Sequence, residues 1–268
     1  MLKARINEGR TAEIYDFEEG KIIKLFRNSF SRKAAESEYR ISSDVASLFL
    51  NAPKVYGTKT VENRFGIIFE KLIGETGQKM VCTRPWLSGK ISRIMAEKHN
   101  EIHSKSGKSL KSQKLMIAHA IDKTDDLVSE EKEKLQNYLK TLPDGVSLCH
   151  GDFHPDNLIF SARGPVVIDW ITAGCGSPAC DIARTCLILD SKAMPANAGL
   201  LTRIIIKILR KSYYRSYRSK ILKLSGLRWS DIENWILPLA AARLTEGNAP
   251  DEQAELLKLV RSKLQHLD

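Results

Sequence analysis

The sequence predicts an α+β protein in which a small β-rich lobe is followed by a larger, mainly helical lobe. Short apolar runs separated by turn residues fill about the first seventy positions, a pattern typical of strands. Beyond them apolar residues recur at helical spacing, and one β-rich island, Leu158–Phe160 with Val166–Ile168, interrupts the helices. Gly74 and the polar residues after it resemble a connector, so we expect a first lobe over 1–73 and a second over 74–268.

The first lobe is predicted to begin with a hairpin. Thr11–Tyr15 and Lys21–Phe26 are apolar-rich runs, and the turn-prone segment Asp16–Gly20 separates them. The next element is a helix over Ser31–Leu50, which Pro53 brings to an end because the position before a proline disfavours helical backbone. Two further strands are predicted over Lys54–Tyr56 and Arg64–Glu70.

The second lobe is predicted to be built from helices. Their apolar residues follow a three-to-four-residue spacing, which places them on one face. The predicted helices cover Pro85–His103, Ser109–Ile121, Ser129–Leu139, Ser177–Leu189, Leu200–Tyr217, Ser230–Glu246 and Asp251–Leu267.

The composition is that of an ordinary globular protein, with 43% hydrophobic and 28% charged residues among 268. No apolar run reaches the roughly 20 residues that span a bilayer, and the N-terminus lacks the apolar core of a secretory signal. We therefore expect a cytoplasmic protein without membrane contact. Its five scattered cysteines include no CxxC pair, which favours reduced thiols over disulfides or a zinc site.

The most informative segment is His150-Gly151-Asp152-Phe153-His154-Pro155-Asp156-Asn157, followed after an apolar run by Asp169. Phosphoryl transfer needs a carboxylate near the acceptor hydroxyl, oxygen ligands for Mg²⁺ and a cation on the phosphates. Asp152 suits the first role, and the side-chain oxygens of Asn157 and Asp169 suit the second. The step from Asp152 to Asn157 equals the Asp-to-Asn step of the protein-kinase catalytic loop.

These motifs resemble those of the aminoglycoside phosphotransferase-like kinases, over nearly the whole chain. The resemblance implies a two-lobed, protein-kinase-like fold, with Asp152 as catalytic base and Asn157 and Asp169 as Mg²⁺ ligands. It also implies that His150 braces the catalytic loop. The segment from Gly176 to Arg184 looks like the family's G-x-P-x-x-D-x-A-R segment, in which Asp181 would hold that loop by hydrogen bonds.

Two other interpretations of the segment stay open. Asp, Asn and Pro are frequent in ordinary turns, where their side chains bond the local backbone. Alternatively, His150, Asp152, His154 and Asp156 alternate as ligands of a zinc hydrolase would on an extended chain, although Pro155 breaks a regular strand. His99 and His103, four apart on a predicted helix, show no pattern that would complete such a site and are expected to pack or lie on the surface.

A nucleotide site is expected in the first lobe. Lys24 lies in an apolar strand, where a charge is costly unless it is paired. A kinase uses such a lysine to bind phosphates and orients it with a glutamate from the following helix. Glu38 is preferred because its distance to Pro53 is similar to the family's spacing, and Glu36 is the second choice. The alternative is a solvent-facing lysine on an edge strand.

Two further segments would complete the binding of ATP, or of GTP. Gly9, Arg10 and Thr11 form the candidate phosphate loop, although its single glycine does not match the G-x-G-x-x-G pattern and an ordinary turn is the alternative. Main-chain groups of Glu70 and Leu72 are expected to meet the base at the hinge. Asp169-Trp170-Ile171 replaces Asp-Phe-Gly and leaves no room for a long activation loop, which favours a small-molecule kinase.

The acceptor is the open question. The net charge is +10, and the last 78 residues hold fourteen Lys or Arg against seven Asp or Glu. This balance favours a neutral or anionic hydroxylated metabolite over a polycationic antibiotic. A catalytically silent nucleotide- or RNA-binding module is the alternative of another class.

Two segments of the second lobe have two interpretations each. Basic and aromatic residues interleave over 210–220, which suits either nucleic acid or, as we favour, a helix with tyrosines packed inward. Arg243, Glu246 and Glu255 suit either an acceptor pocket or helical surface pairs.

Overall fold

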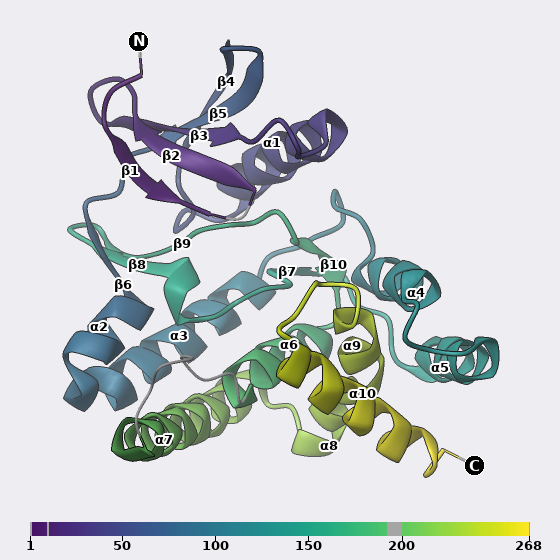
Figure 1. Ribbon diagram of the computed structural model, residues 1–268. Helices are drawn as coiled ribbons and strands as arrows, with labels where there is room; N and C mark the ends of the chain where they lie inside the picture. The colour runs from purple at the N-terminus through teal and green to yellow at the C-terminus, as the bar shows by residue number, and fades with distance from the viewer. Residues whose placement is uncertain (1, 10, 192–199, 268) are drawn as a thin grey trace. The chain divides into compact units, whose positions relative to one another are not determined.

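The computed structural model describes residues 2–9, 11–191 and 200–267 (Figure 1). The chain forms two compact units. The first unit joins Met1–Lys79 to Asp156–Thr172, and the second joins Met80–Pro155 to Ala173–Asp268. The segment Asp156–Thr172 therefore belongs to the first unit, although residues of the second unit precede and follow it in the sequence.

The first unit contains a five-stranded antiparallel sheet in the order β1-β2-β3-β5-β4, with helix α1 packed against it. In β3, Ile23 and Leu25 are fully buried on one face, and the period-two alternation of a strand places Lys24 on the other. On that other face Ala35 of α1 joins an apolar cluster with Phe26 of β3. These elements are β1 (Arg5–Glu8), β2 (Ala12–Asp16), β3 (Lys21–Phe26), α1 (Arg32–Leu48), β4 (Val55–Val61) and β5 (Arg64–Glu70).

A smaller three-stranded sheet completes the first unit. Its strands, in the order β6-β8-β9, are Gly74–Thr76, Leu158–Ser161 and Gly164–Val167. Strands β8 and β9 form an antiparallel hairpin in which Leu158 pairs with Val167. The predicted β-rich island is thus confirmed.

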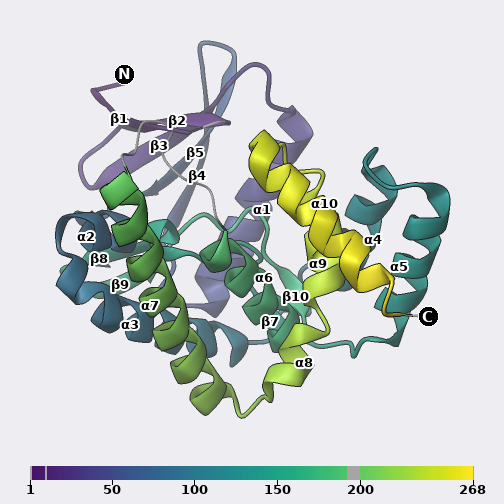
Figure 2. The same ribbon diagram turned by 60° about the horizontal axis from the view of Figure 1, so that its bottom comes forward.

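The second unit is mostly helical (Figure 2). Helices α3 and α7 pack along each other, and the hydroxyl of Tyr213 on α7 donates to the sulfur of Met95 on α3. Its helices are α2 (Gly77–Thr83), which begins in the first unit, α3 (Ser88–His103), α4 (Gln113–Lys123), α5 (Ser129–Thr141), α6 (Pro178–Asp190), α7 (Leu200–Ser225), α8 (Trp229–Glu233), α9 (Ile236–Arg243) and α10 (Pro250–Leu264). Two short strands, β7 (Ser147–Cys149) and β10 (Gly174–Gly176), pair antiparallel.

The predicted α+β fold class is confirmed, and most predicted elements are present. The single helix predicted over Ser230–Glu246 is wrong, since α8 and α9 replace it. Pro238 has no N–H to bond the carbonyl of Asn234, which instead accepts the hydroxyl of Tyr138 at 3.0 Å. In the described part of the chain, we find no helix with the length and apolarity that crossing a membrane requires.

Candidate functional site

In the first unit Lys24 is held between two carboxylates. Its ammonium lies 2.6 Å from Oε1 of Glu38 and 3.1 Å from Oδ1 of Asp169. The lysine is on β3, the glutamate on α1, and the aspartate follows β9, so three elements contribute to the pairing. Glu36, the second choice from the sequence, pairs instead with Arg32 one turn away on α1. Strand β3, which carries Lys24, is the central strand of its sheet, so the edge-strand alternative is wrong.

Burial and neighbouring charges shift the pKa values of Lys24 and Glu38 in this group of three. Burial lowers the pKa of Lys24, but Asp169 and Glu38 more than compensate, so the pKa is raised and the ammonium stays protonated. Burial, together with the charge of Asp169, raises the pKa of Glu38 against the opposing effect of Lys24. Glu38 is 1% exposed, whereas the side chain of Asp169 is 42% exposed. Asp169 is therefore the carboxylate that a ligand can reach.

Asn157 and Asp169 lie at the same end of the β8–β9 hairpin. Asn157 directly precedes β8, and its carbonyl accepts the N–H of Ile168 at 3.0 Å. Asp169 is the next residue and has φ 63°, a left-handed conformation that a non-glycine residue adopts at a local cost. The amide and the carboxylate supply the hard oxygen atoms that Mg²⁺ prefers. The two residues therefore fit a Mg²⁺ ion bound together with nucleotide phosphates.

The candidate phosphate loop is a tight turn between β1 and β2. The N–H of Gly9 donates to the carbonyl of Ala12 at 2.8 Å, and the carbonyl of Thr11 accepts the N–H of Arg27 at 2.9 Å. Arg10 lies outside the described residues. The turn is thus fixed to the start of β2 and to the end of β3, the strand that carries the phosphate-binding candidate.

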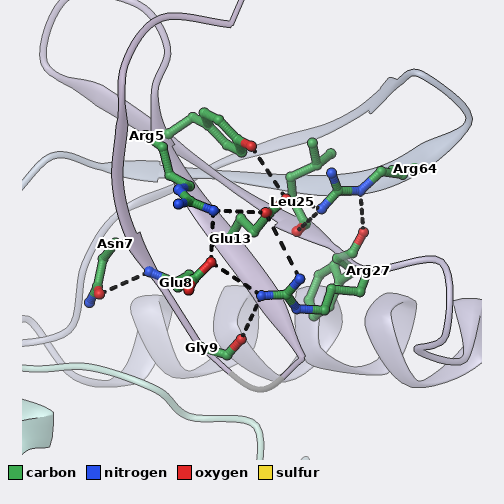
Figure 3. Close-up of polar contacts among 10 residues, drawn as sticks. Arg5, Asn7, Glu8, Gly9, Glu13, Leu25, Arg27 and Arg64 are labelled. Carbon is green, nitrogen blue, oxygen red and sulfur yellow. Dashed lines mark hydrogen bonds and ion pairs between the residues drawn. The ribbon is translucent and has the colours of Figure 1, made fainter.

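Side chains reinforce this turn (Figure 3). The guanidinium of Arg27 donates to the carbonyl of Gly9 at 3.4 Å and pairs with Glu8 at 3.5 Å. Arg5 links Glu8, at 2.7 Å, to Glu13, at 3.3 Å. Charged side chains therefore anchor a loop that lacks the glycines of a protein-kinase loop.

At the candidate hinge, the side chain of Glu70 is occupied. Its carboxylate accepts the N–H of Lys54 at 3.1 Å and a guanidinium N–H of Arg163 at 2.9 Å. The N–H of Glu70 donates to the carbonyl of Lys54. Leu72 lies in the connector between β5 and β6.

In the second unit Asp152 lies on the loop after β7. Its side chain is 35% exposed, 3.5 Å from His154 and 3.6 Å from Arg184. Burial by itself raises the pKa of Asp152, but the His154 hydrogen bond and the charges of His154 and Arg184 lower it to about 2. The carboxylate is thus ionised at neutral pH and can accept a proton.

A buried aspartate braces this loop. The carboxylate of Asp181, on the first turn of α6, accepts the N–H of His150 at 2.7 Å and that of Gly151 at 2.8 Å. The Nε2 atoms of His99 and His103 lie 3.0 Å and 3.1 Å from the same carboxylate. His150 in turn accepts the N–H of Asp152 on Nδ1.

The sequence did not predict a role for His99 and His103, which were expected to pack or to lie on the surface. Burial, then the charge of His103, lowers the pKa of His99 to about 4, so its ring is neutral. Burial raises the pKa of Tyr217, which keeps its proton and donates to Nδ1 of His99 at 2.6 Å. Nε2 of His99 therefore carries the hydrogen that faces Asp181. Only the four-residue spacing of the histidines hinted at this network.

The zinc alternative gains no support from the described residues. The group whose ligand atoms lie within 4.8 Å of one another is His99, His103 and Asp181. The oxygens of Asp181 already accept two backbone and two imidazole N–H groups, so hydrogen bonding satisfies this carboxylate without a metal ion. In the basic-aromatic stretch, Tyr213 and Tyr217 are buried, as the packing interpretation predicts.

Comparisons with solved structures show the fold. An aminoglycoside phosphotransferase, APH(4)-Ia, aligns over 99% of this chain and 93% of its own, with a TM-score of 0.68 and 16% identity. APH(3'')-Id from Streptomyces rimosus, solved with ADP and streptomycin, aligns over 86% of this chain and 90% of its own, with a TM-score of 0.57 and 14% identity. A choline/ethanolamine kinase family protein from Mesorhizobium loti aligns over 100% of this chain and 87% of its own, with a TM-score of 0.50 and 14% identity.

No curated protein matches the sequence. The model of one protein family, described as the phosphotransferase enzyme family, matches residues 4–203. The match covers both the strand with Lys24 and the loop with Asp152. Together with the kinase-like fold, it shows that the chain belongs to the phosphotransferase enzyme family.

Proposed function

We propose that the protein is a Mg²⁺-dependent small-molecule kinase that transfers the γ-phosphate of ATP, or of GTP, to a hydroxyl group. The observation that carries this proposal is the ammonium of Lys24 between Glu38 and Asp169, at 2.6 Å and 3.1 Å. A buried cation paired in this way is oriented and keeps its charge, as phosphate binding requires.

In the proposed reaction Asp152 accepts the proton of the acceptor hydroxyl. The acceptor oxygen forms a bond to the γ-phosphorus, the bond from that phosphorus to its bridging oxygen breaks, and the nucleoside diphosphate leaves. With a pKa of about 2, Asp152 is a weak base, so it orients the hydroxyl and receives the proton late. This suits a loose transition state in which little proton transfer is needed early.

Asn157 and Asp169 would hold Mg²⁺, which when bound neutralises charge on the phosphates. The turn at Gly9, Arg10 and Thr11 would cover the phosphates through the Thr11 hydroxyl and main-chain N–H groups other than that of Gly9, which donates to Ala12. Leu72 through its main chain, and Glu70 through its carbonyl, would meet the base, because the N–H of Glu70 donates to Lys54. The hairpin geometry that brings Asn157 and Asp169 to one end supports the metal assignment.

The acceptor we favour is a neutral or anionic hydroxylated metabolite, on the strength of the net charge. An aminated antibiotic is the second candidate, and one local observation favours it. The carboxylates of Asp152 and Glu246 are 35% and 33% exposed, while the guanidinium of Arg184 between them is 11% exposed. The surface beside the base is therefore locally anionic. Neighbours of this fold have been solved with hygromycin B and with streptomycin.

A phosphate-transfer screen tests both candidates. Wild type, Asp152→Ala and a chelator-treated sample are given ATP or GTP with a panel of sugars, polyols, amino alcohols and aminoglycosides. We expect transfer only by wild type with Mg²⁺, with nucleotide affinity retained in Asp152→Ala. Equal turnover by Asp152→Ala, measured as hydrolysis where no acceptor is found, contradicts the role of the base. Nucleotide binding without any turnover by wild type favours a silent binding module.

A further inference from the structure

Arg184 on α6 contacts the catalytic loop at two points. Its Nε–H donates to the carbonyl of Gly151 at 3.0 Å, and one terminal nitrogen lies 3.6 Å from Asp152. The other terminal nitrogen donates to Glu246 at 2.5 Å. One guanidinium therefore joins the loop backbone, the proposed base and a carboxylate far along the chain.

Glu246 supplies most of the counter-charge for this guanidinium. The side chain of Arg184 is 11% exposed, and a buried cation is stable only when paired and hydrogen-bonded. The 3.6 Å contact to Asp152 is longer than a hydrogen bond, whereas the contact to Glu246 is short. Burial lowers the pKa of Arg184, and Glu246, then Asp152, more than restore it.

Glu246 is itself held in place. It lies in the turn between α9 and α10, where Nε of Arg243 approaches its second oxygen at 3.3 Å. The same guanidinium donates to Glu252 on α10 at 2.8 Å, and the side chain of Arg243 is 8% exposed. Two buried arginines thus alternate with carboxylates from Asp152 to Glu252.

We propose that Glu246 is a positioning residue for the base, acting through Arg184; this rests on the proposed role of Asp152. By binding one edge of the guanidinium, Glu246 keeps Nε on the carbonyl of Gly151 and leaves only a loose contact to Asp152. Without that charge, the guanidinium turns toward Asp152, which then pairs tightly and loses the orientation that an acceptor hydroxyl needs.

The test is steady-state kinetics of Glu246→Gln and Glu246→Asp, with Glu233→Gln on the exposed side of α8 as the matched control. Hydrolysis of the nucleotide serves where no acceptor is known. We expect kcat to fall about tenfold in Glu246→Gln and less in Glu246→Asp, which keeps the charge, while KM for the nucleotide stays within about twofold. Thermal unfolding of each variant checks that it is folded.

A second measurement does not depend on turnover. The Nε–H resonance of Arg184, assigned by its absence in Arg184→Lys, should exchange slowly with water in wild type and faster in both Glu246 variants. A kcat equal to that of Glu233→Gln, or unchanged exchange, overturns the inference. A wild type that shows neither transfer nor hydrolysis counts against the proposed function instead, and the exchange rate still shows whether Glu246 holds Arg184. Should Glu246→Gln not fold, Glu246→Asp decides by the same readouts.

Discussion

The brace beneath the catalytic loop can be tested by replacing Asp181 with asparagine. The substitution keeps the shape of the side chain and removes its charge. At present Oδ2 accepts N–H groups from His99, His103 and His150, and Oδ1 accepts that of Gly151. However the new amide is oriented, its NH₂ group faces at least one of these donors, so at least one buried N–H loses its acceptor.

The expected loss follows from the burial of this group. Asp181 is 0% exposed, and the histidines lower its pKa well below the ordinary value despite burial, which by itself raises it. A hydrogen bond to a charged group contributes about 1.5–3 kcal/mol, and all four bonds to Asp181 are weakened or lost when its charge is removed. We expect Asp181→Asn to lower the free energy of unfolding by about 3–5 kcal/mol, a large share of the roughly 5–15 kcal/mol of a typical domain.

Urea unfolding followed by tryptophan fluorescence and by circular dichroism measures this loss. Asp125→Asn, at an exposed position, is the matched control and should stay within about 0.5 kcal/mol of wild type. Turnover of folded Asp181→Asn should also fall, because the loop that carries Asp152 loses its anchor. A loss of stability below about 1 kcal/mol would refute the view that one ionised carboxylate holds these donors.

The other predictions concern the pairs around this brace and around the nucleotide site. Lys24→Met should lower kcat about 100-fold or more, because the phosphates lose their cation, and nucleotide titration should show weaker binding. Tyr217→Phe should lower the free energy of unfolding in urea by about 1–3 kcal/mol, since Nδ1 of His99 loses its buried donor. The pKa of Asp152 is lowered from 3.8 to about 2, so its contribution to stability is present above pH 3.8 and lost as pH falls through about 2. Wild type should therefore lose unfolding free energy more steeply than Asp152→Asn between about pH 5 and pH 2. Arg27→Gln should raise KM for ATP by up to about fivefold with kcat unchanged, because its contacts to the turn at Gly9 are partly exposed.

The fold was predictable where local pattern decides it. The apolar run KIIKLF predicted a strand, and the structure places Lys24 on the face opposite Ile23 and Leu25. Only the strand pairing showed that this strand is central and not at an edge. The pattern failed over Ser230–Glu246, because apolar spacing continues across the break between α8 and α9, where Pro238 supplies no N–H to the carbonyl of Asn234. Apolar spacing reports which face is buried, and backbone hydrogen bonding sets the breaks.

In the candidate site, too, local spacing in the sequence predicted some residues, whereas the choice of others depends on the fold. Asp152, Asn157 and Asp169 could be proposed from the sequence because a short loop and one hairpin fix their spacing. Spacing alone left Glu36 and Glu38 both open, and the preference for Glu38 came from a resemblance. The register of α1 on the sheet brings Glu38 to Lys24 and leaves Glu36 on the surface with Arg32.

Residues that act through a distant partner leave no such spacing. His99 and Tyr217 are 118 positions apart, and Arg184 and Glu246 are 62 apart, yet each pair is in hydrogen-bond contact. Net charge also leaves such pairs out of account, because it counts buried, paired arginines in full. The side chains of Arg184 and Arg243 are 11% and 8% exposed, whereas the carboxylates of Asp152 and Glu246 beside Arg184 are 35% and 33% exposed. Under the proposed function, the +10 of the whole chain favours a neutral or anionic acceptor and this local surface favours an aminated one, so the transfer screen decides between two opposing electrostatic effects.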